Sequence, residues 1–282
     1  MLVVSGPQNP VLSKRLADQL GVPLARVETK RFPDGEAYAR LTTPVRGQDV
    51  VVVQSTVSDG ALVELLLIQD ACRRSNARSV TTVIPYLGYA RQDRVFVDGE
   101  AVSAEVVARI IERSTDRVLL VDPHRPAISH MFHVPCRAVT AVPAICDHLR
   151  NLGVEVVLAP DAGAAERAHE AAMFLKAKSD HLEKKRLTST EVVMMPKEMA
   201  VDGRTVVILD DIISTGGTMV KAAGELKRQG AKKVVAACTH GLFIQDALPK
   251  LLSSGVDEVV ATDTIEGQAS LVSVASVVAK AL

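Results

Sequence analysis

Short apolar runs of strand length alternate along this chain with longer amphipathic segments. A continuous apolar run is expected for a parallel strand covered on both faces, and apolar residues that recur every three or four positions indicate a helix packed on a sheet. This alternation predicts an α/β fold throughout. The predicted strands cover residues 2–5, 50–54, 80–85, 117–121, 155–159, 206–209, 233–239 and 258–262. The predicted helices cover residues 11–20, 62–75, 103–112, 141–152, 164–172, 219–229 and 247–253.

The order of the predicted elements divides the chain near residue 140. Both halves show a similar succession of strands and helices, although sequence identity between them is faint. A chain of 282 residues suits two domains, since domains commonly contain about 100–200 residues. We therefore predict two similar α/β domains, 1–140 and 141–282, each with a mostly parallel sheet flanked by helices. The tail 270–282 is apolar enough to pack as a helix on either domain, including the N-terminal one.

Two stretches interrupt the alternation. Residues 29–44 contain Phe32-Pro-Asp-Gly-Glu36, a turn-forming sequence that favours a β-hairpin. Residues 176–200 contain a cluster of lysines and are longer than a usual connection in a compact fold. Active-site lids have this composition, and so do solvated surface loops, so both interpretations stay open.

Composition limits the kinds of partner. Basic and acidic residues number 33 each, so no overall field favours nucleic acid or an anionic membrane, and a phosphate site must be a local concentration of charge. This argues for a small anionic ligand. The N-terminus lacks the pattern of a signal peptide, and no apolar stretch reaches about 18 residues, which predicts a cytoplasmic protein. The 4 cysteines show no metal-binding spacing, so buried free thiols are expected.

The most informative segment covers residues 205–218. The predicted strand ends at Asp210 and Asp211, and ligands of open α/β sheets bind beyond the carboxyl ends of strands. The turn that follows is rich in hydroxyl groups and glycine: Ser214, Thr215, Gly216, Gly217 and Thr218. Because glycines let N–H groups approach an anion and a helix follows, we expect a phosphate at this turn. The carboxylates would repel that phosphate, so we expect them to accept hydrogen bonds from sugar hydroxyls or to hold Mg²⁺.

A second polar segment follows the strand predicted over residues 80–85. Arg91 and Arg94 offer planar guanidinium groups suited to polyphosphate, and Gln92 can hydrogen-bond a base or a ribose. A surface loop with incidental arginines is the alternative. We expect a ligand with a polyphosphate group at this strand end.

Two more strand ends carry candidate metal ligands. Asp122-Pro-His124 places a carboxylate and an imidazole two residues apart, and Asp161 precedes two small residues that admit a close ligand. A capped strand end and a helix N-cap are the competing roles for these residues. A cation held by His124 and Asp161 would lie between the two halves, and Mg²⁺ fits best because it needs few protein ligands.

Residues 210–218 resemble the phosphoribosyl pyrophosphate (PRPP) binding motif that phosphoribosyltransferases and PRPP synthetases share. The order of motifs along the whole chain is similar to the PRPP synthetase family, the ribose-phosphate diphosphokinases, and most to its short archaeal-type members. The motifs are Phe-Pro-Asp-Gly-Glu at 32–36, Arg-Gln-Asp at 91–93, Asp-Pro-His at 122–124, Pro-Asp-Ala-Gly at 160–163, Lys-Lys-Arg at 184–186 and the Asp-Asp turn at 210–218.

The resemblance implies a set of site residues. ATP would be bound by Phe32, Asp34, Gly35 and Glu36, reaching across a subunit interface, and by Arg91, Gln92 and Asp93. Ribose 5-phosphate would be bound by Arg186, Asp210, Asp211, Ser214, Thr215, Gly216, Gly217 and Thr218. His124 and Asp161 would hold Mg²⁺, and Lys184 with Arg186 would be the catalytic pair on a mobile loop.

The same resemblance implies a reaction, transfer of the diphosphoryl group of Mg·ATP to the C1 hydroxyl of ribose 5-phosphate, in a homodimer or larger homo-oligomer. Two alternatives remain at this point, a phosphoribosyltransferase and a catalytically silent regulatory homologue. The chain departs from many family members at the proline of Asp-Pro-His, in the lysine-rich sequence before Lys184 and in its short length. These departures leave phosphate activation, nucleotide inhibition and hexamer formation open.

Overall fold

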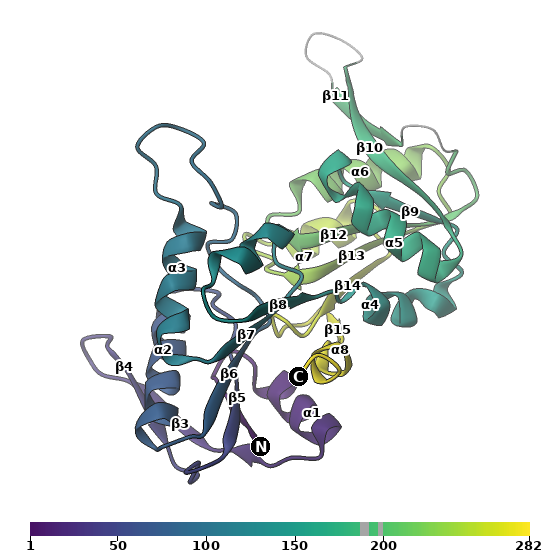
Figure 1. Cartoon of the computed structure of the whole chain (residues 1–282). Coiled ribbons are helices and arrows are strands. Elements are labelled where there is room, and N and C mark those ends of the chain that lie inside the picture. The colour runs from purple at the N-terminus through teal and green to yellow at the C-terminus, as the bar shows by residue number, and fades with distance from the viewer. Residues whose placement is uncertain (187–191, 197–199) are drawn as a thin grey trace. The chain divides into compact units, whose positions relative to one another are not determined.

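The computed structural model describes the backbone of residues 1–186, 192–196 and 200–282, and the side chains of residues 1–183 and 200–282. The chain forms two compact units (Figure 1). Unit 1 contains Met1–Thr140, Asp263–Glu266 and Ser273–Leu282, and unit 2 contains Ala141–Thr262 and Gly267–Val272. The chain therefore returns from unit 2 to unit 1 twice near its C-terminal end.

Unit 1 is built on a parallel sheet of six strands in the order β2-β1-β5-β6-β7-β8. These strands are β1 (Leu2–Ser5), β2 (Leu24–Ala25), β5 (Asp49–Val53), β6 (Ser79–Ile84), β7 (Arg117–Val121) and β8 (Cys136–Val139). An antiparallel hairpin pairs β3 (Val27–Arg31) with β4 (Ala37–Leu41). The helices are α1 (Pro10–Leu20), α2 (Asp59–Arg74), α3 (Ser103–Ile111), α8 (Ala275–Ala279) and the 3₁₀ helices η1 (Glu112–Ser114) and η2 (Pro126–Met131).

The sheet of unit 1 is buried on both faces. Alternate strand residues such as Val4, Val52 and Leu120 pack against Leu65 and Ile68 of α2. The intervening strand residues are buried as well, because α1 and α8 cover the opposite face (Figure 1). This two-sided burial explains why these strands are apolar at nearly every position.

Unit 2 is built on a sheet of seven strands in the order β11-β10-β9-β12-β13-β14-β15, parallel except for the β10–β11 pair. The strands are β9 (Val156–Ala159), β10 (Lys178–Arg186), β11 (Val192–Pro196), β12 (Thr205–Ile213), β13 (Lys233–Gly241), β14 (Glu258–Thr262) and β15 (Ser270–Val272). The helices are α4 (Val142–Leu149), α5 (Ala165–Leu175), α6 (Gly217–Arg228), α7 (Ala247–Ser253) and the 3₁₀ helices η3 (Arg150–Leu152) and η4 (Ala162–Ala164).

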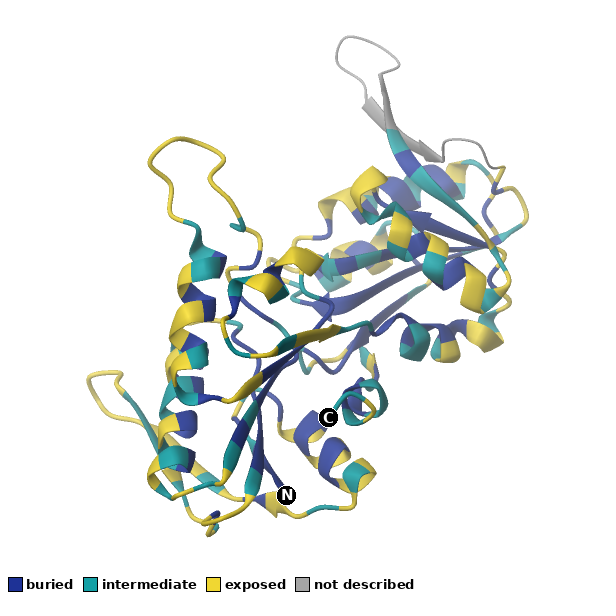
Figure 2. Ribbon diagram, in the orientation of Figure 1, coloured by how far each residue is buried: buried dark blue, intermediate teal, exposed yellow. Residues whose placement is uncertain are grey.

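Helices also cover both faces of the sheet in unit 2. Alternate strand residues such as Ile208 and Ala236 pack against Ala222 and Leu226 of α6 and against Leu251 of α7. Helices α4 and α5 contact the strands from the other face. The resulting dark band of buried strands runs through the middle of each unit in Figure 2.

The predicted α/β architecture is confirmed, and the turn sequence at 32–36 does join the strands of a hairpin. Three details differ from the expectation. Strand 206–209 is longer than predicted, because pairing with β13 continues through Asp210 to Ile213. The stretch 176–200 is not a loop throughout, since β10 and β11 form an antiparallel pair within it. The helix expected over 270–282 is limited to α8, because residues 270–272 add β15 to the sheet of unit 2.

The cysteines are free thiols, and Cys72, Cys146 and Cys238 are buried. Burial raises the pKa of Cys72 and Cys146 to about 12, so these groups stay neutral and act as small apolar side chains. Among the helices in the described part of the chain, none combines the length and the apolar character that crossing a bilayer requires.

Candidate functional site

The acidic pair lies on β12 at the point where its neighbour β9 has ended. Register pairs Ile208 with Leu158 of β9, and beyond Ala159 strand β12 pairs with β13 alone. Asp210 and Asp211 therefore lie at the carboxyl edge of the sheet, although they belong to the strand itself. This edge is where ligands of open α/β sheets bind.

The two carboxylates are held in an electrostatically unfavourable arrangement. Asp211 is buried, and its N–H donates to Oδ1 of Asp210 over 2.8 Å. Nη1 of Arg167, from α5, lies 3.7 Å from Oδ1 of Asp211. Burial, together with the side-chain hydrogen bond and the negative charge of Asp211, raises the pKa of Asp210 to about 7, and the backbone N–H of Asp211 and the charge of Arg167 oppose this rise. Near neutral pH Asp210 can therefore act as a hydrogen-bond donor as well as an acceptor.

The turn after β12 leads directly into the N-terminus of α6. Gly216 adopts a left-handed φ of 71°, which favours glycine, and α6 begins at Gly217 without a side-chain cap among the described residues. A Cβ at Gly216 would make ordinary van der Waals contact with Leu251 at 3.4 Å, so the left-handed backbone rather than a lack of space favours glycine here. Thr215 and Thr218 are exposed beside these amides. Uncapped N–H groups and the helix dipole make this terminus suited to an anion.

Backbone hydrogen bonds from the segment after β13 fix this turn. The N–H groups of Leu242 and Phe243 donate to the carbonyl of Ile213 at 3.0 and 3.1 Å, and the N–H of Ile244 donates to the carbonyl of Ser214 at 3.2 Å. The turn is therefore preorganised by the sheet. Preorganisation lowers the entropic cost of binding.

Asp161 lies at the carboxyl end of β9 in the same unit. Its Oδ1 accepts hydrogen bonds from the N–H of Gly163 at 2.8 Å and of Ala164 at 3.2 Å, so it caps η4. Helix η4 contacts both β10 and β12, which brings this acid to the sheet edge that carries the acidic pair. The cap uses one carboxylate oxygen, and the side chain is exposed, so the predicted metal role and the capping role are compatible.

Lys184 and Arg186 lie on β10. Register pairs His181 of β10 with Ala159 of β9, and from Leu182 onward β10 pairs with β11 instead, so both basic residues come after the carboxyl end of β9. Their side chains lie outside the described residues.

In unit 1, the segment that carries Arg91, Gln92 and Asp93 follows β6. Gln92 is tied to the start of α3, since the N–H of Ala104 donates to its carbonyl over 3.1 Å. Oδ2 of Asp93 pairs with Nε of Arg125 over 3.1 Å, and the side chain of Asp93 is only 10% exposed. Its Oδ1 is buried without a hydrogen-bond partner among the described residues.

Asp122 and His124 follow β7, the neighbour of β6. Asp122 is buried with a φ of 37°, and His124 is exposed. The Asp93–Arg125 ion pair joins this segment to the one after β6, so the structure brings two of the predicted segments together at one edge of the sheet. Sequence reasoning missed Arg125, because a lone arginine next to a histidine carries no distinguishing pattern.

The hairpin turn at 32–36 is well formed and exposed. The N–H of Gly35 donates to the carbonyl of Phe32 over 2.9 Å, and the N–H of Glu36 donates to Oδ1 of Asp34 over 3.1 Å. Gly35 has a left-handed φ of 92°, and the Phe32 ring is 42% exposed. Arg31 anchors the hairpin to α2 through Glu64 over 2.7 Å. Figure 1 shows the hairpin and the segment after β6 as separate projections of unit 1.

The position in unit 1 where a ligand is most often found is filled by the protein itself. The chain leaves β1 toward β2 on one side and returns to β5 on the other, and ligands commonly bind at such a reversal. Asn9 Nδ2 donates to the carbonyls of Asp263 at 3.4 Å and Thr264 at 3.1 Å, and Ser55 Oγ donates to the carbonyl of Thr264 at 2.6 Å. Residues 263–266 therefore fill the crevice between β1 and β5. The strand ends of β6 and β7 are the remaining candidates for a ligand site in unit 1.

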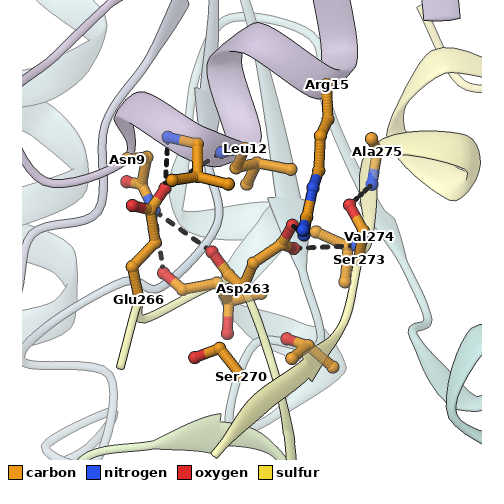
Figure 3. A network of polar contacts seen from close by, with 12 residues as sticks. Asn9, Leu12, Arg15, Asp263, Glu266, Ser270, Ser273, Val274 and Ala275 are labelled. Carbon is orange, nitrogen blue, oxygen red and sulfur yellow. Dashed lines mark hydrogen bonds and ion pairs between the residues drawn. The ribbon is translucent and has the colours of Figure 1, made fainter. Parts of the chain in front are cut away.

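Side chains of the same returning segment bind α1 (Figure 3). Oε1 of Glu266 accepts hydrogen bonds from the N–H groups of Val11 at 2.8 Å and Leu12 at 2.9 Å, and Oδ2 of Asp263 pairs with Arg15 over 2.9 Å. Glu266 thus caps a helix whose bonded residues, Val11 and Leu12, lie 255 and 254 positions away in sequence. No local pattern could reveal this partner, because capping motifs are recognised by short spacing.

Comparison with known proteins identifies relatives along the full chain. Residues 1–114 match the N-terminal domain of ribose phosphate pyrophosphokinase, and residues 156–278 match the phosphoribosyl synthetase-associated domain. The ribose-phosphate pyrophosphokinase of Methanopyrus kandleri is 44% identical, covering 100% of this chain and 98% of the relative. That of Methanothermobacter thermautotrophicus is 41% identical, covering 99% and 98%. The crystal structure of phosphoribosylpyrophosphate synthetase from Mycobacterium smegmatis aligns with a TM-score of 0.85 and 28% identity over 99% of this chain and 96% of that one.

Proposed function

We propose that this chain, which belongs to the ribose-phosphate pyrophosphokinase family, transfers the diphosphoryl group of ATP to the C1 hydroxyl of ribose 5-phosphate. As a member of that family the chain is an enzyme, a transferase of nucleotide biosynthesis. The products are PRPP and AMP. The active enzyme is a cytoplasmic homo-oligomer, a dimer in its smallest form.

One observation carries the proposal: unit 2 combines an acidic pair with a helix N-terminus that no described side chain caps. Asp210 and Asp211 offer carboxyl oxygens for the ribose hydroxyls, and the turn Ser214–Thr218 offers N–H and hydroxyl groups for the 5-phosphate. The raised pKa of Asp210 supports this assignment. A carboxyl group that is partly protonated near pH 7 repels a phosphate less strongly than a carboxylate does, and it can both donate a hydrogen bond to a ribose hydroxyl and accept one from it. Arg186 completes the site as a cation.

ATP is assigned to the strand ends of β6 and β7 in unit 1. Arg91 pairs with phosphate oxygens, Gln92 hydrogen-bonds the nucleoside, and Asp93 holds the two segments together through Arg125. Phe32, Asp34, Gly35 and Glu36 complete the nucleotide site of a neighbouring subunit. The separation of the hairpin turn from the Arg91 segment within unit 1 supports completion by a second copy (Figure 1).

We assign Mg²⁺ to His124 and Asp161. His124 and Asp161 are exposed at strand ends, and a cation that keeps several waters needs no more than one or two protein ligands. No group of three or more metal-binding side chains occurs among the described residues. When bound with ATP, Mg²⁺ would neutralise charge on the phosphate oxygens.

The remaining chemistry is positioning and electrostatic stabilisation. The C1 hydroxyl oxygen attacks the β-phosphorus in line, a new O–P bond forms, and the bond to the α-phosphate breaks as AMP leaves. Lys184 and Arg186 act as cations that stabilise the charge on the transferring group, so no covalent intermediate with the protein is required. The acidic pair orients the ribose so that the C1 hydroxyl faces the triphosphate.

Product analysis tests the proposal. Purified protein is incubated with Mg²⁺, ATP and ribose 5-phosphate, with and without inorganic phosphate, and the products are separated and quantified. PRPP and AMP in equal amounts are expected. ADP in place of AMP would show transfer of a single phosphoryl group and overturn the assignment. Absence of any product from protein that still binds both substrates would identify a silent homologue. In a parallel incubation with PRPP and a nucleobase, base-dependent consumption of PRPP would identify a phosphoribosyltransferase.

A further inference from the structure

We infer that Glu100 is a positioning residue for the nucleotide: it fixes the amide of Gln92 so that the amide oxygen faces a hydrogen-bond donor of the bound nucleoside. The inference rests on the proposed function, because it takes the segment after β6 to be the ATP site. It goes further in naming the residue that shapes this segment and the kind of nucleotide atom that is recognised.

One carboxylate oxygen organises the segment. Oε2 of Glu100 accepts hydrogen bonds from Nε2 of Gln92 at 3.0 Å, from the N–H of Phe96 at 2.9 Å and from the N–H of Val97 at 3.0 Å. The N–H of Glu100 donates back to the carbonyl of Val97 over 3.2 Å, which closes the turn. These backbone bonds lower the pKa of Glu100, so the group is ionised at neutral pH.

The same contacts determine which edge of the Gln92 amide faces outward. Glu100 Oε2 and the carbonyl of Arg94, 3.3 Å away, are both acceptors, so the amide atom that faces them is the NH₂ group. The carbonyl oxygen lies on the opposite edge of the planar amide. Gln92 therefore presents an acceptor, which selects a ligand hydrogen-bond donor. An adenine amino group and a ribose hydroxyl are the donors that ATP offers.

The backbone of Gln92 is fixed independently of this side-chain contact. Its N–H donates to the carbonyl of Tyr89 over 3.2 Å, and its carbonyl accepts from the N–H of Ala104 over 3.1 Å. Loss of the Glu100 carboxylate would thus release the side chain of Gln92 and the 94–97 turn while the start of α3 stays in place. The apolar residues at this turn are exposed, Phe96 at 53% and Val97 at 65%, and the centroid of the Phe96 ring lies 4.9 Å from the guanidinium carbon of Arg94 in the same turn, a contact that does not tie the turn to α3.

The test compares Glu100→Ala with Glu105→Ala in the full-length protein. Glu105 lies on α3 and pairs with Arg109 one turn away, so it is a carboxylate outside the 92–100 segment. Equilibrium binding of ATP is measured by calorimetry, and KM for each substrate is measured where product forms. We expect Glu100→Ala to weaken ATP binding on the order of tenfold, the loss of about one good hydrogen bond, without changing KM for ribose 5-phosphate. Glu105→Ala should bind ATP like the wild type.

Three further measurements separate positioning from a merely structural role. Gln92→Ala combined with Glu100→Ala should lose no more affinity than Gln92→Ala alone, because Glu100 acts through Gln92. Wild-type discrimination against GTP, which lacks the 6-amino donor, should shrink in Glu100→Ala if the base is recognised, and discrimination against 2′-deoxy-ATP should shrink if a ribose hydroxyl is recognised. Amide exchange of residues 94–97 should accelerate in Glu100→Ala, with that of Gln92 and of α3 unchanged.

The outcomes distinguish this inference from the proposed function. Wild-type protein that binds no ATP would remove the proposed function itself. Wild-type ATP affinity in Glu100→Ala, or additive losses in the double variant, would overturn the positioning role of Glu100 while leaving the proposed function standing. Faster amide exchange without any change in ATP affinity would show that Glu100 only stabilises the turn.

Discussion

Asp210 and Asp211 show how adjacent residues acquire different properties on one strand. Asp211 is buried beside Arg167, whereas Asp210 is half-buried at the edge of the sheet, and its burial with the neighbouring negative charge raises its pKa to about 7. The folded protein therefore binds a proton between about pH 4 and pH 7 that the unfolded chain releases. The stability contribution of Asp210 is present in full below its unfolded pKa and is lost as the pH rises through 7.

The first prediction concerns this pair. Asp210→Asn carries no titrating group, so its free energy of unfolding should rise relative to wild type between pH 5 and pH 7.5 and then stay level. Denaturation at several pH values, followed by circular dichroism because the chain has no Trp, measures the difference. Asp202→Asn serves as the control, since Asp202 is exposed. A wild-type advantage that grows with pH would show that the pKa of Asp210 is lowered.

The second prediction concerns Lys184, whose role comes from its position in the Lys-Lys-Arg motif. Lys184→Ala should lower kcat on the order of 10³ with a much smaller change in substrate affinity, because the cation acts chiefly on the transition state. Steady-state kinetics with both substrates measures this. Lys178→Ala, an exposed lysine earlier on the same strand, should leave kcat unchanged. Wild-type turnover in Lys184→Ala would remove the assignment.

Among the elements, α1 depends on a residue from the other end of the chain. Asn9 at its N-cap position makes no side-chain cap bond, and Glu266 accepts the hydrogen bonds of the first free amides instead. Burial raises the pKa of Glu266, so its ionisation costs more in the folded than in the unfolded state. The hydrogen bonds, rather than the charge, are therefore the favourable part of this cap.

The third prediction separates the effect of the hydrogen bonds of Glu266 from the effect of its charge. Glu266→Ala should reduce the free energy of unfolding by about 1 kcal/mol, the usual cost of a lost cap. Glu266→Gln keeps one acceptor oxygen without the charge, and it should gain on the wild type as the pH rises above 4.5, the ordinary pKa that burial shifts upward. Chemical denaturation at pH 5 and pH 8 separates the two effects. Equal losses in both variants at pH 8 would show that the charge itself stabilises α1.

At the scale of the whole molecule, unit 1 is completed only when the C-terminal residues return to it. Val274 and Val278 are fully buried, and α8 packs against α1. Asp263 links the two returning segments, since its Oδ1 accepts from the N–H of Val274 over 2.9 Å while its Oδ2 pairs with Arg15. The last residues therefore belong to the core of the first unit.

The fourth prediction tests this dependence. Deletion of residues 273–282 should destabilise unit 1 by roughly 3 kcal/mol or more, because two buried valines are removed and each contributes about 1.5–3 kcal/mol. Limited proteolysis should then cut within residues 1–140 before it cuts the strands of unit 2. Deletion of residues 281–282 alone is the matched control. Equal protease resistance of unit 1 in both truncated proteins would contradict the prediction.

The sequence by itself determined the alternation of strands and helices, the hairpin at 32–36 and the turn at 214–218. Each depends on residues close together in the chain, where apolar period, glycine and hydroxyl content act locally. It also carried the motifs that define the family. Tertiary structure alone decided the continuation of β12 past Asp210, the β10–β11 pair, the Asp93–Arg125 contact and the closure of the β1–β5 crevice by residues 263–266. These features arise from pairing between distant segments, and a single sequence records no partner for a hydrogen bond made about 250 residues away.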